Sequence, residues 1–272
     1  MVVIMILNGN KIEELTNKKI LIENVIKENI RGASYDITGE DYILTFKEKK
    51  NPISFTDIEE LENMYTKVNI KDGYVLKPQE TILIPIVEIF NIPNDICAHI
   101  RGRTSFNRLG LSLALQHLNP GYKGKLNITL TNNSPNTYIL LPKMRFGQIV
   151  FEHLDSKASD NLLYYNEKTP VYYNESGYSG SKIYADLIGK VVRHYKGNYY
   201  YIEDICLNSE TKEYMIIYKT LYDRTDSNIW TRPAKMFFDK IDKNKKDNKW
   251  KQTHRFEIVD SLTIDYTKEK ES

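Results

Sequence analysis

Cationic and hydroxyl side chains crowd one short stretch of the sequence. The stretch HIRGRTSFNRLG, which begins at His99, holds Arg101, Arg103, Thr104, Ser105 and Arg108 beside Gly102 and Gly110. Guanidinium groups, hydroxyls and close backbone N–H groups are the donors that bind a triphosphate. The alternative is an exposed polar turn between strands, and composition alone does not decide between the two.

Short β-type runs must position this stretch. KLNITLTNNS, from Lys125, alternates apolar and polar residues, and residues 73–90 read as two strands joined at a Pro-Gln-Glu turn. LLPKMRFGQIVFEHL repeats the pattern around a Pro-Lys-Met-Arg turn. Many short strands at this spacing predict an all-β domain, closed or double-layered. A helix is expected around residues 11–28, and MVVIMIL at the N-terminus is expected to be a buried strand.

Composition narrows the class of protein. The chain has 272 residues, 41% of them hydrophobic, and a formal net charge of +2, so a packed core is expected and a nucleic-acid partner is not. The basic run DKNKKDNKWKQ is expected to be a solvated loop. No apolar run is long enough to span a membrane. Two isolated cysteines, Cys97 and Cys206, indicate a reducing compartment and no metal site, so we expect a cytoplasmic protein.

The composition changes along the second half of the chain. Residues 155–182 are rich in Tyr, Asn, Ser and Gly, which suits an arm or lid. A second β-rich unit is expected over residues 188–260, followed by a charged tail, residues 261–272. The first domain is accordingly expected to span residues 1–182.

Five ordered motifs resemble the dCTP deaminase/dUTPase superfamily over residues 15–182. Gly102–Gly110 is similar to its phosphate motif, and Asn119–Gly124 (NPGYKG) to its Asp-Pro-Gly hairpin. RGASYDITG, GYVLKPQETIL and FGQIVFE resemble further elements of the deaminases. The resemblance implies a jelly roll that assembles as a trimer, with nucleotide sites at subunit junctions and a C-terminal arm that closes each site.

The resemblance also implies roles for individual residues. Tyr122 would stack on the deoxyribose, Asn119 would face the 3′-hydroxyl, and Tyr178 is the retained tyrosine of the arm. Mg²⁺ would be held through the ligand phosphates rather than by a protein carboxylate cage. The phosphates would be held by Arg103, Thr104, Ser105, Arg108 and Gln148.

The positions that carry catalysis in this superfamily are changed. The deaminases' glutamate corresponds to Thr129, and the dUTPases' hairpin aspartate corresponds to Asn119. Neither side chain is a base near neutral pH. Asp36, Glu152 or Glu175 could substitute from elsewhere in the chain.

The C-terminal unit resembles a small bacterial domain family of unknown role, with an SH3-like β-barrel fold. The resemblance rests on RHYKG from Arg193, the Ser-Glu-Thr turn at Ser209 and WTRP from Trp230. Arg193, His194, Tyr195, Trp230 and Arg232 could line a groove for a base or sugar. Alternatively, aromatic residues fill the barrel core; these would be Tyr199, Tyr201, Trp230 and Phe237.

Three functions compete on this evidence. The favoured one is a binding protein that senses or sequesters a nucleotide, as a phage could use to counter a nucleotide-based defence. The second is an active dCTP deaminase or dUTP diphosphatase with a relocated base. The third is a protein-interaction module with a vestigial pocket.

Overall fold

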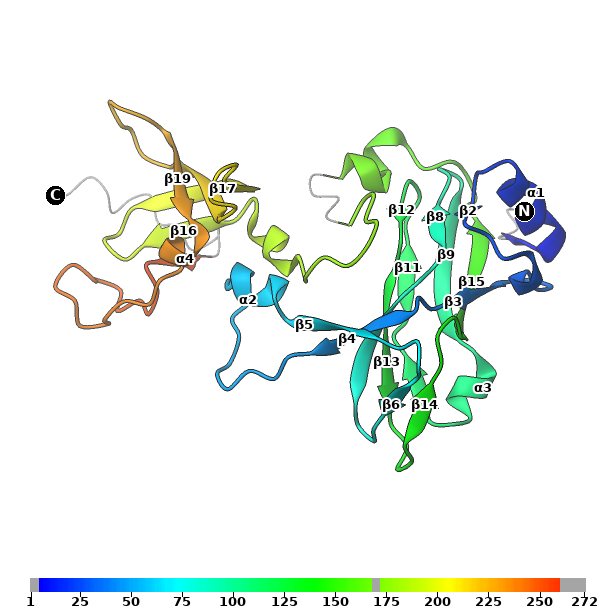
Figure 1. Ribbon diagram of the computed structural model, residues 1–272. Coiled ribbons are helices and arrows are strands. Elements are labelled where there is room, and N and C mark those ends of the chain that lie inside the picture. Colours follow the sequence, from blue (N-terminus) through cyan, green and yellow to red (C-terminus); the bar gives the residue numbers. More distant parts are fainter. Residues whose placement is uncertain (1–4, 168–171, 260–272) are drawn as a thin grey trace. The chain divides into compact units, whose positions relative to one another are not determined.

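The chain forms two compact units in the computed structural model, which describes residues 5–167 and 172–259 (Figure 1). The first unit comprises residues 1–48 and 65–179, and the second comprises residues 49–64 and 180–272. The division after Ser179 lies close to the predicted boundary at residue 182. The assignment of residues 49–64 to the second unit is a feature that the sequence did not indicate.

Antiparallel sheets build the first unit. One sheet has the order β1 (Met5–Ile6), β15 (Arg145–His153), β9 (Ile96–Gly102), β11 (Gln116–Leu118), with β3 (Tyr35–Thr38) also paired to β15. The other has the order β10 (Leu111–Leu113), β13 (Asn127–Asn132), β7 (Thr81–Pro85), β4 (Tyr42–Phe46), β5 (Tyr65–Asn69). Smaller sheets join β12 (Lys123–Gly124), β8 (Ile89–Asn91) and β2 (Ile22–Glu23), and β14 (Tyr138–Leu140) with β6 (Tyr74–Leu76). The predicted jelly-roll fold is confirmed.

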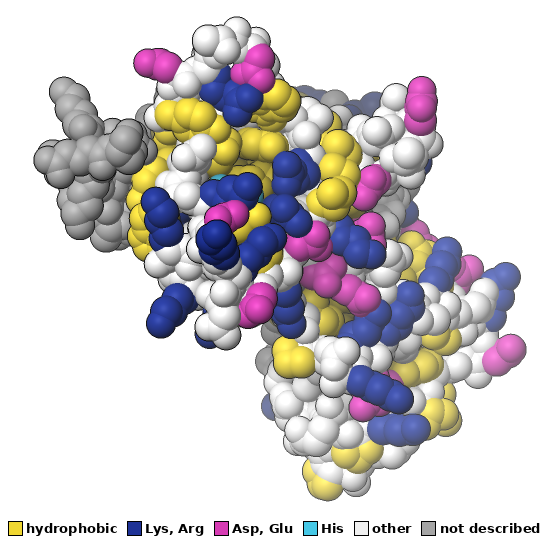
Figure 2. All heavy atoms as spheres, turned by 90° about the vertical axis from the view of Figure 1, so that its left-hand side faces the viewer, with side chains coloured by type: hydrophobic (Ala, Val, Ile, Leu, Met, Phe, Trp, Pro, Cys, Tyr) yellow, Lys and Arg dark blue, Asp and Glu magenta, His cyan; other side chains and the backbone are white. Residues whose placement is uncertain are grey.

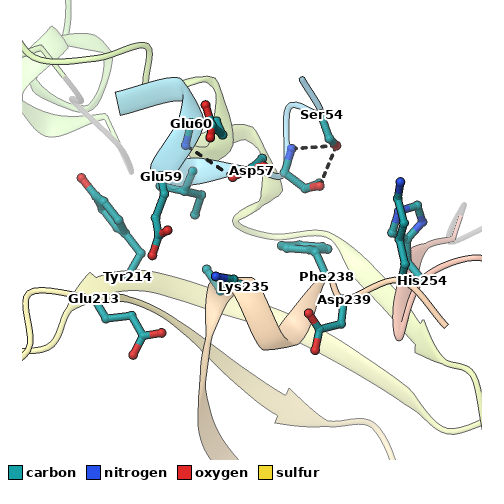
Figure 3. Close-up of a pocket in the computed structure, with 14 residues that line it drawn as sticks. Ser54, Asp57, Glu59, Glu60, Glu213, Tyr214, Lys235, Phe238, Asp239 and His254 are labelled. Carbon is teal, nitrogen blue, oxygen red and sulfur yellow. Dashed lines mark hydrogen bonds between the residues drawn. The ribbon is translucent and has the colours of Figure 1, made fainter. Parts of the chain in front are cut away.

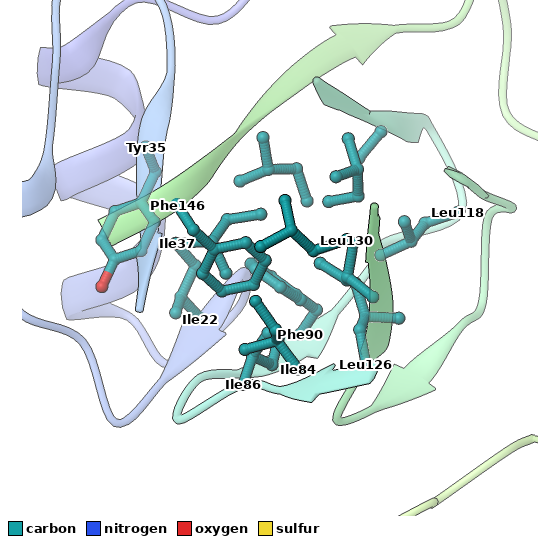
Figure 4. Close-up of a cluster of buried hydrophobic side chains, with 14 of the residues drawn as sticks. Ile22, Tyr35, Ile37, Ile84, Ile86, Phe90, Leu118, Leu126, Leu130 and Phe146 are labelled. Atoms are coloured by element: carbon teal, nitrogen blue, oxygen red, sulfur yellow. The ribbon is translucent and has the colours of Figure 1, made fainter. Parts of the chain in front are cut away.

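Strand alternation creates the core of this unit, because successive side chains of a strand point to opposite faces. In β13, Ile128 and Leu130 are fully buried while Asn127 and Thr129 are partly exposed. Aromatic and branched residues from several strands pack together in this core, with Tyr35, Phe90, Ile84 and Phe146 among them (Figure 4).

The predicted helix over residues 11–28 is wrong in its second half. Helix α1 covers Gly9–Asn17, and the Asn8 side chain caps its first turn by accepting from the Lys11 N–H at 2.9 Å. Lys19 then adopts a positive φ of 59°, which ends the helix. Leu21 and Ile22 are buried instead, and Ile22 pairs with Phe90 as part of β2. Burial in the core thus overrides the helical spacing.

The predicted burial of the N-terminal strand is also wrong for Met5 and Ile6, although it holds for Leu7. Met5 and Ile6 form β1 at the edge of the sheet and pair with His153 and Glu152, but both side chains are exposed. Burial begins at Leu7. Residues 1–4 lie outside the described residues.

The predicted arm contains two short 3-10 helices, η2 (Asp160–Leu162) and η3 (Tyr164–Asn166). Further on it runs beside the hairpin at β12, where Asn174 N–H donates to Lys123 O and Lys125 N–H donates to Glu175 O, both at 2.8 Å. The other short helices of this unit are η1 (Lys27–Asn29) and α3 (Thr104–Asn107).

One five-stranded antiparallel sheet forms the second unit. Its order is β19 (Ile229–Pro233), β18 (Tyr214–Thr220), β17 (Tyr199–Leu207), β16 (Val191–His194), β20 (Phe256–Ile258), and its helices are α2 (Ile58–Glu62), η4 (Ile183–Leu187) and α4 (Ala234–Phe237). In the described residues β19 and β20 are the edges of this sheet, so the closed SH3-like barrel stays a prediction. The charged tail, residues 261–272, lies outside the described residues.

Aromatic rings fill the core of the second unit, although not all of the predicted ones. Phe237 stacks on Phe256 with ring centroids 3.9 Å apart, and Trp230 packs against the same cluster. Tyr199 and Tyr201 are not part of it; the side chains of β17 that face the core are Tyr200, Ile202 and, beyond an irregularity in the register, Ile205. The alternation of inward and outward side chains at the start of β17 is therefore shifted by one residue from the predicted one.

Residues 49–64, which lie between β4 and β5 in sequence, complete that core. Ile58 and Leu61 of α2 are buried in the aromatic cluster. The Glu62 carboxylate accepts hydrogen bonds from the Tyr184 hydroxyl at 3.0 Å and the Tyr214 hydroxyl at 3.1 Å. This segment is therefore a structural part of the second unit.

Shortening Leu61 to alanine tests this assignment. Leu61→Ala should lower the free energy of unfolding by about 2–5 kcal/mol, because it leaves a cavity in a packed core. Chemical denaturation followed by tyrosine and tryptophan fluorescence measures the change. Glu59→Ala, on the exposed side of the same helix, is the control and should change stability by no more than about 0.5 kcal/mol. Equal effects of the two substitutions would contradict the burial of α2 in this core.

Candidate functional site

The segment Gly102–Gly110, which was predicted to bind phosphate, begins at the last residue of β9. Arg103 precedes the short helix α3, and Thr104, Ser105 and Arg108 are exposed. In the sheet, Gln148 of β15 lies between two neighbours, Asp36 of β3 and Arg101 of β9. The sheet register therefore brings the predicted glutamine to the strand that carries the motif.

A buried carboxylate lies at the centre of this region. Asp36 is 3% exposed, and its Oδ2 atom lies 2.9 Å from Arg31 Nη2 and 3.4 Å from Arg145 Nη1. Arg103 Nε lies 3.7 Å from Asp36 Oδ1, and Arg103 Nη1 donates to the Arg145 carbonyl at 2.7 Å. The predicted phosphate ligand Arg103 is thus held in place by Asp36 and by the backbone of β15.

This arrangement leaves positive charge in excess. Three guanidinium groups surround one carboxylate, so two positive charges are not balanced within the cluster. Such a preorganised cationic site attracts anions. Arg31 and Arg145 were not predicted as members of the site. Arg31 lies in the segment RGASYDITG together with Asp36, and Arg145 lies three residues before Gln148. Their closeness in sequence to these residues was the signal that could have identified them.

A groove of about 690 Å³ opens on the outer face of the same sheet. Gln148 and Arg101 line it together with His99, His117 and Asn107. The groove is therefore polar and cationic at the end where Gln148 lies.

The NPGYKG hairpin lies away from the motif. β11 runs antiparallel to β9 with Leu118 opposite Ala98, so Asn119 follows at the start of β9 whereas Arg103 follows its end. Figure 1 accordingly draws β12 and α3 at opposite ends of the first unit. One chain does not bring the predicted sugar-binding and phosphate-binding residues together.

Asn119 is exposed, whereas Tyr122 is only 6% exposed. The Tyr122 hydroxyl donates to the Lys125 carbonyl at 3.0 Å, and its ring lies 5.4 Å from that of Tyr164 in the arm. Burial raises the pKa of this tyrosine, so it stays neutral. Stacking of a sugar on Tyr122 therefore requires the arm around Tyr164 to move.

Thr129 lies in the middle of β13, opposite Leu83 of β7, with its side chain partly exposed. The three acidic residues that could replace a base there lie in different surroundings. Asp36 is paired with arginines, and Glu152 lies near His99. Glu175 lies beside the hairpin, where its carboxylate accepts from the Ser179 N–H at 3.0 Å and the Ser179 hydroxyl at 2.6 Å.

Tyr178, the last residue predicted for this site, is half-buried. Its ring packs edge-on against that of Tyr65, with centroids 4.8 Å apart. Nearby, the Asn127 side chain at the start of β13 donates to the Gly177 carbonyl at 3.4 Å. The end of the arm therefore packs on the strand that carries Thr129.

Of the five residues suggested for a groove in the second unit, Tyr195 is buried and its ring lies 4.3 Å from that of His194. His194 and Arg232 both contact Phe256, at 4.8 Å and 5.9 Å from its ring centroid. Arg193 donates to Gln252 at 2.7 Å and lies over Trp250, while Trp230 donates to the Ser227 carbonyl and lies under Arg224. Burial, with Arg232 next in effect, lowers the pKa of His194 to about 4. His194 is thus a neutral ring packed among aromatic ones.

The cavity drawn in Figure 3 belongs to the second unit and measures about 310 Å³. Glu59, Glu213 and Asp239 face Lys235 and His254 around it (Figure 3). No residue predicted for a site lines this cavity. Its mixed charges give it no clear preference for an anion or a cation.

Surface charge is mixed as well. Lys and Arg side chains are interspersed with Asp and Glu over the face in Figure 2.

None of the helices formed by residues 5–167 and 172–259 has the length and apolar character that a membrane crossing requires.

Comparison with known proteins gives two family matches. A family model described as dCTP deaminase-like matches residues 6–154, and one described as a protein of unknown function (DUF1653) matches residues 190–258. A protein of Nanoarchaeum equitans named dCTP deaminase, dUMP-forming, is 32% identical over 202 residues, which cover 68% of this chain and 100% of the relative. A Dictyoglomus turgidum protein of the same name is 27% identical over 193 residues, covering 68% and 98%.

Two solved structures are similar to separate parts of the chain. The deoxycytidine triphosphate deaminase from Agrobacterium tumefaciens matches with a TM-score of 0.47 and 18% identity, over 55% of this chain and 49% of that one. A DUF1653 protein from Bordetella bronchiseptica matches with a TM-score of 0.25 and 28% identity, over 29% and 96%. These matches show that the chain belongs to the dCTP deaminase/dUTPase family, and that a DUF1653 domain follows its dCTP deaminase-like domain.

Proposed function

We propose that this protein binds a nucleoside triphosphate without efficient turnover, and that it acts by sensing or sequestering the nucleotide. The observation that carries the proposal is the excess of guanidinium groups around Asp36, next to Gln148. Arg103, Thr104, Ser105, Arg108 and Gln148 would contact the phosphates. The expected setting is the cytoplasm, where such nucleotides are found.

The substituted residues argue against the chemistry of the named relatives. Deamination of cytosine requires a group that carries a proton between water and the base. Thr129 offers a hydroxyl and Asn119 an amide, and neither titrates near neutral pH. Loss of a general base lowers the rate of the reaction by about 10²- to 10⁴-fold. The protein would therefore still bind the nucleotide but convert it only slowly.

The separation of the two half-sites supports a homotrimer. Asn119 and Tyr122 lie at the opposite end of β9 from Arg103, so a second copy of the chain has to supply one half of each pocket. The arm that carries Tyr164 and Tyr178 would move to admit the ligand.

Mg²⁺ would enter with the triphosphate. The carboxylate nearest to the phosphate motif is that of Asp36, and its oxygens are occupied by arginines, so it does not suit a hard cation. The chain's own residues would orient the phosphates, and the ion would offset their charge.

An active deaminase or diphosphatase is the second candidate, and the position of Glu175 favours it. The backbone of Glu175 pairs with Lys125 between the hairpin and β13, close to where a nucleotide base would lie. Hydrogen bonds from the Ser179 N–H and hydroxyl hold this carboxylate in place beside the hairpin.

Arg103→Ala should weaken triphosphate binding by about 10- to 100-fold, since a charge-assisted hydrogen bond contributes about 1.5–3 kcal/mol. Calorimetry with a panel of deoxynucleoside triphosphates and Mg²⁺ measures the affinity. Arg224→Ala is the matched control, because it removes an exposed arginine that lies in the second unit and outside the cluster around Asp36, and it should leave the affinity unchanged. Unchanged affinity in Arg103→Ala, or the absence of any nucleotide-induced rise in melting temperature, would point to an interaction module with a vestigial pocket.

Incubation of the wild-type protein with dCTP or dUTP and Mg²⁺ should return the nucleotide intact. Mass spectrometry of both the solution and the ligand released by heating detects any product. Steady formation of dUTP or dUMP would instead identify an enzyme. In that case Glu175→Gln should abolish product formation while leaving ligand binding in place, whereas Glu167→Gln in the same arm should not.

A further inference from the structure

Metal-ligating side chains gather on the outer face of β9 and β15. Cys97 and His99 are two residues apart on β9, so they point to the same side of the sheet. Glu152 of β15 lies directly opposite Cys97 in the register. The sheet thus places a thiol, an imidazole and a carboxylate side by side, although they come from strands far apart in sequence.

The distances between the ligand atoms suit a single ion. His99 Nε2 lies 3.9 Å from Cys97 Sγ and 3.8 Å from Glu152 Oε2, and all three ligand atoms lie within 4.8 Å of one another. Bond lengths of about 2.0–2.3 Å in a tetrahedral zinc site imply spacings of about 3.3–3.7 Å between ligand atoms. Small side-chain rotations therefore suffice to close the three ligands on a metal.

His117 of β11 prepares His99 for this role. The two residues are paired in the sheet, and His117 Nδ1 lies 3.3 Å from His99 Nδ1. In the tautomer in which His99 Nδ1–H donates to His117 Nδ1, the Nε2 lone pair of His99 is free to face Cys97 and Glu152. Histidine ligands of metals commonly donate their other N–H in this way.

Burial makes the cluster partly enclosed yet accessible. Cys97 is 9% exposed, while the side chains of His99 and Glu152 are 35% and 22% exposed. This is the one group of three such side chains that residues 5–167 and 172–259 bring within reach of a single ion.

We propose that Cys97, His99 and Glu152 bind a divalent metal ion such as Zn²⁺, with His117 as a positioning residue. A thiolate and an imidazole favour such an ion over Mg²⁺ or Ca²⁺. Binding forms a metal–sulfur bond and releases the Cys97 thiol proton to solvent. Three protein ligands leave a fourth position for water or a ligand atom on the side of the groove that His99 lines. The site does not depend on the proposed nucleotide function.

Metal titration of the full chain tests the proposal. After chelation and dialysis, the protein should bind about one Zn²⁺ per chain, measured by elemental analysis and by a rise in melting temperature. Substitution with Co²⁺ should produce the absorption band of a thiolate ligand. Cys97→Ser should abolish that band and weaken Zn²⁺ binding by more than about 100-fold, because loss of a ligand's hydrogen-bond partner alone costs about 10- to 100-fold.

Matched variants separate this site from adventitious binding. Cys206→Ser removes the other free cysteine, which is exposed on β17, and should leave the band and the affinity unchanged. His117→Ala should weaken binding by about 10- to 100-fold and keep the thiolate band. Failure to bind Zn²⁺, or equal binding by wild type and Cys97→Ser, would overturn the proposal, as would loss of the band in Cys206→Ser alone.

Discussion

The pairing of β9 with β15 is the constraint on which both candidate sites depend. Its register runs unbroken from Gly147 opposite Gly102 to His153 opposite Ile96. Because side chains alternate along each strand, this register turns Ile100 and Ile149 into the core and Gln148 and Glu152 outward. A slip of one residue would turn the outward-facing polar side chains of the slipped strand into the core and expose its core residues. The hydrophobic core thus fixes the positions of the polar side chains on the opposite face.

Charge balance is the second constraint, and it acts at the edge of the same sheet. Asp36 follows the buried Tyr35 on β3 and is itself excluded from water. A buried carboxylate is strongly unfavourable unless it is paired, so the fold requires at least one guanidinium group beside it. Arg31 comes from the segment before β3, Arg103 from the end of β9 and Arg145 from the start of β15. The ion pairs therefore hold together three segments that meet at the phosphate motif.

Local patterns predicted the strands and the order of the motifs, because alternation and turn residues are properties of neighbouring positions. β13 and the turn before β15 follow directly from KLNITLTNNS and LLPKMRFGQIV. The errors have tertiary causes. Leu21 and Ile22 lie in the predicted helix but are buried in the core, Ile22 as part of β2. In β17, Tyr200 rather than its tyrosine neighbours packs against the core. The cluster of Cys97 with Glu152 and the packing of α2 in the second unit were invisible for the same reason, since each joins distant parts of the chain.

Retention of Arg103 is not in itself evidence for nucleotide binding, because its pairing with Asp36 gives it a structural role. The number of arginines is the stronger argument. One guanidinium would neutralise Asp36, yet three surround it, and packing alone does not require the other two. Like charges held close together are unfavourable unless an anion offsets them. Thr104 and Ser105 are exposed beside this excess charge, where hydroxyl donors serve a ligand rather than the core. The excess charge and the exposed donors together favour a phosphate ligand over a purely structural cluster.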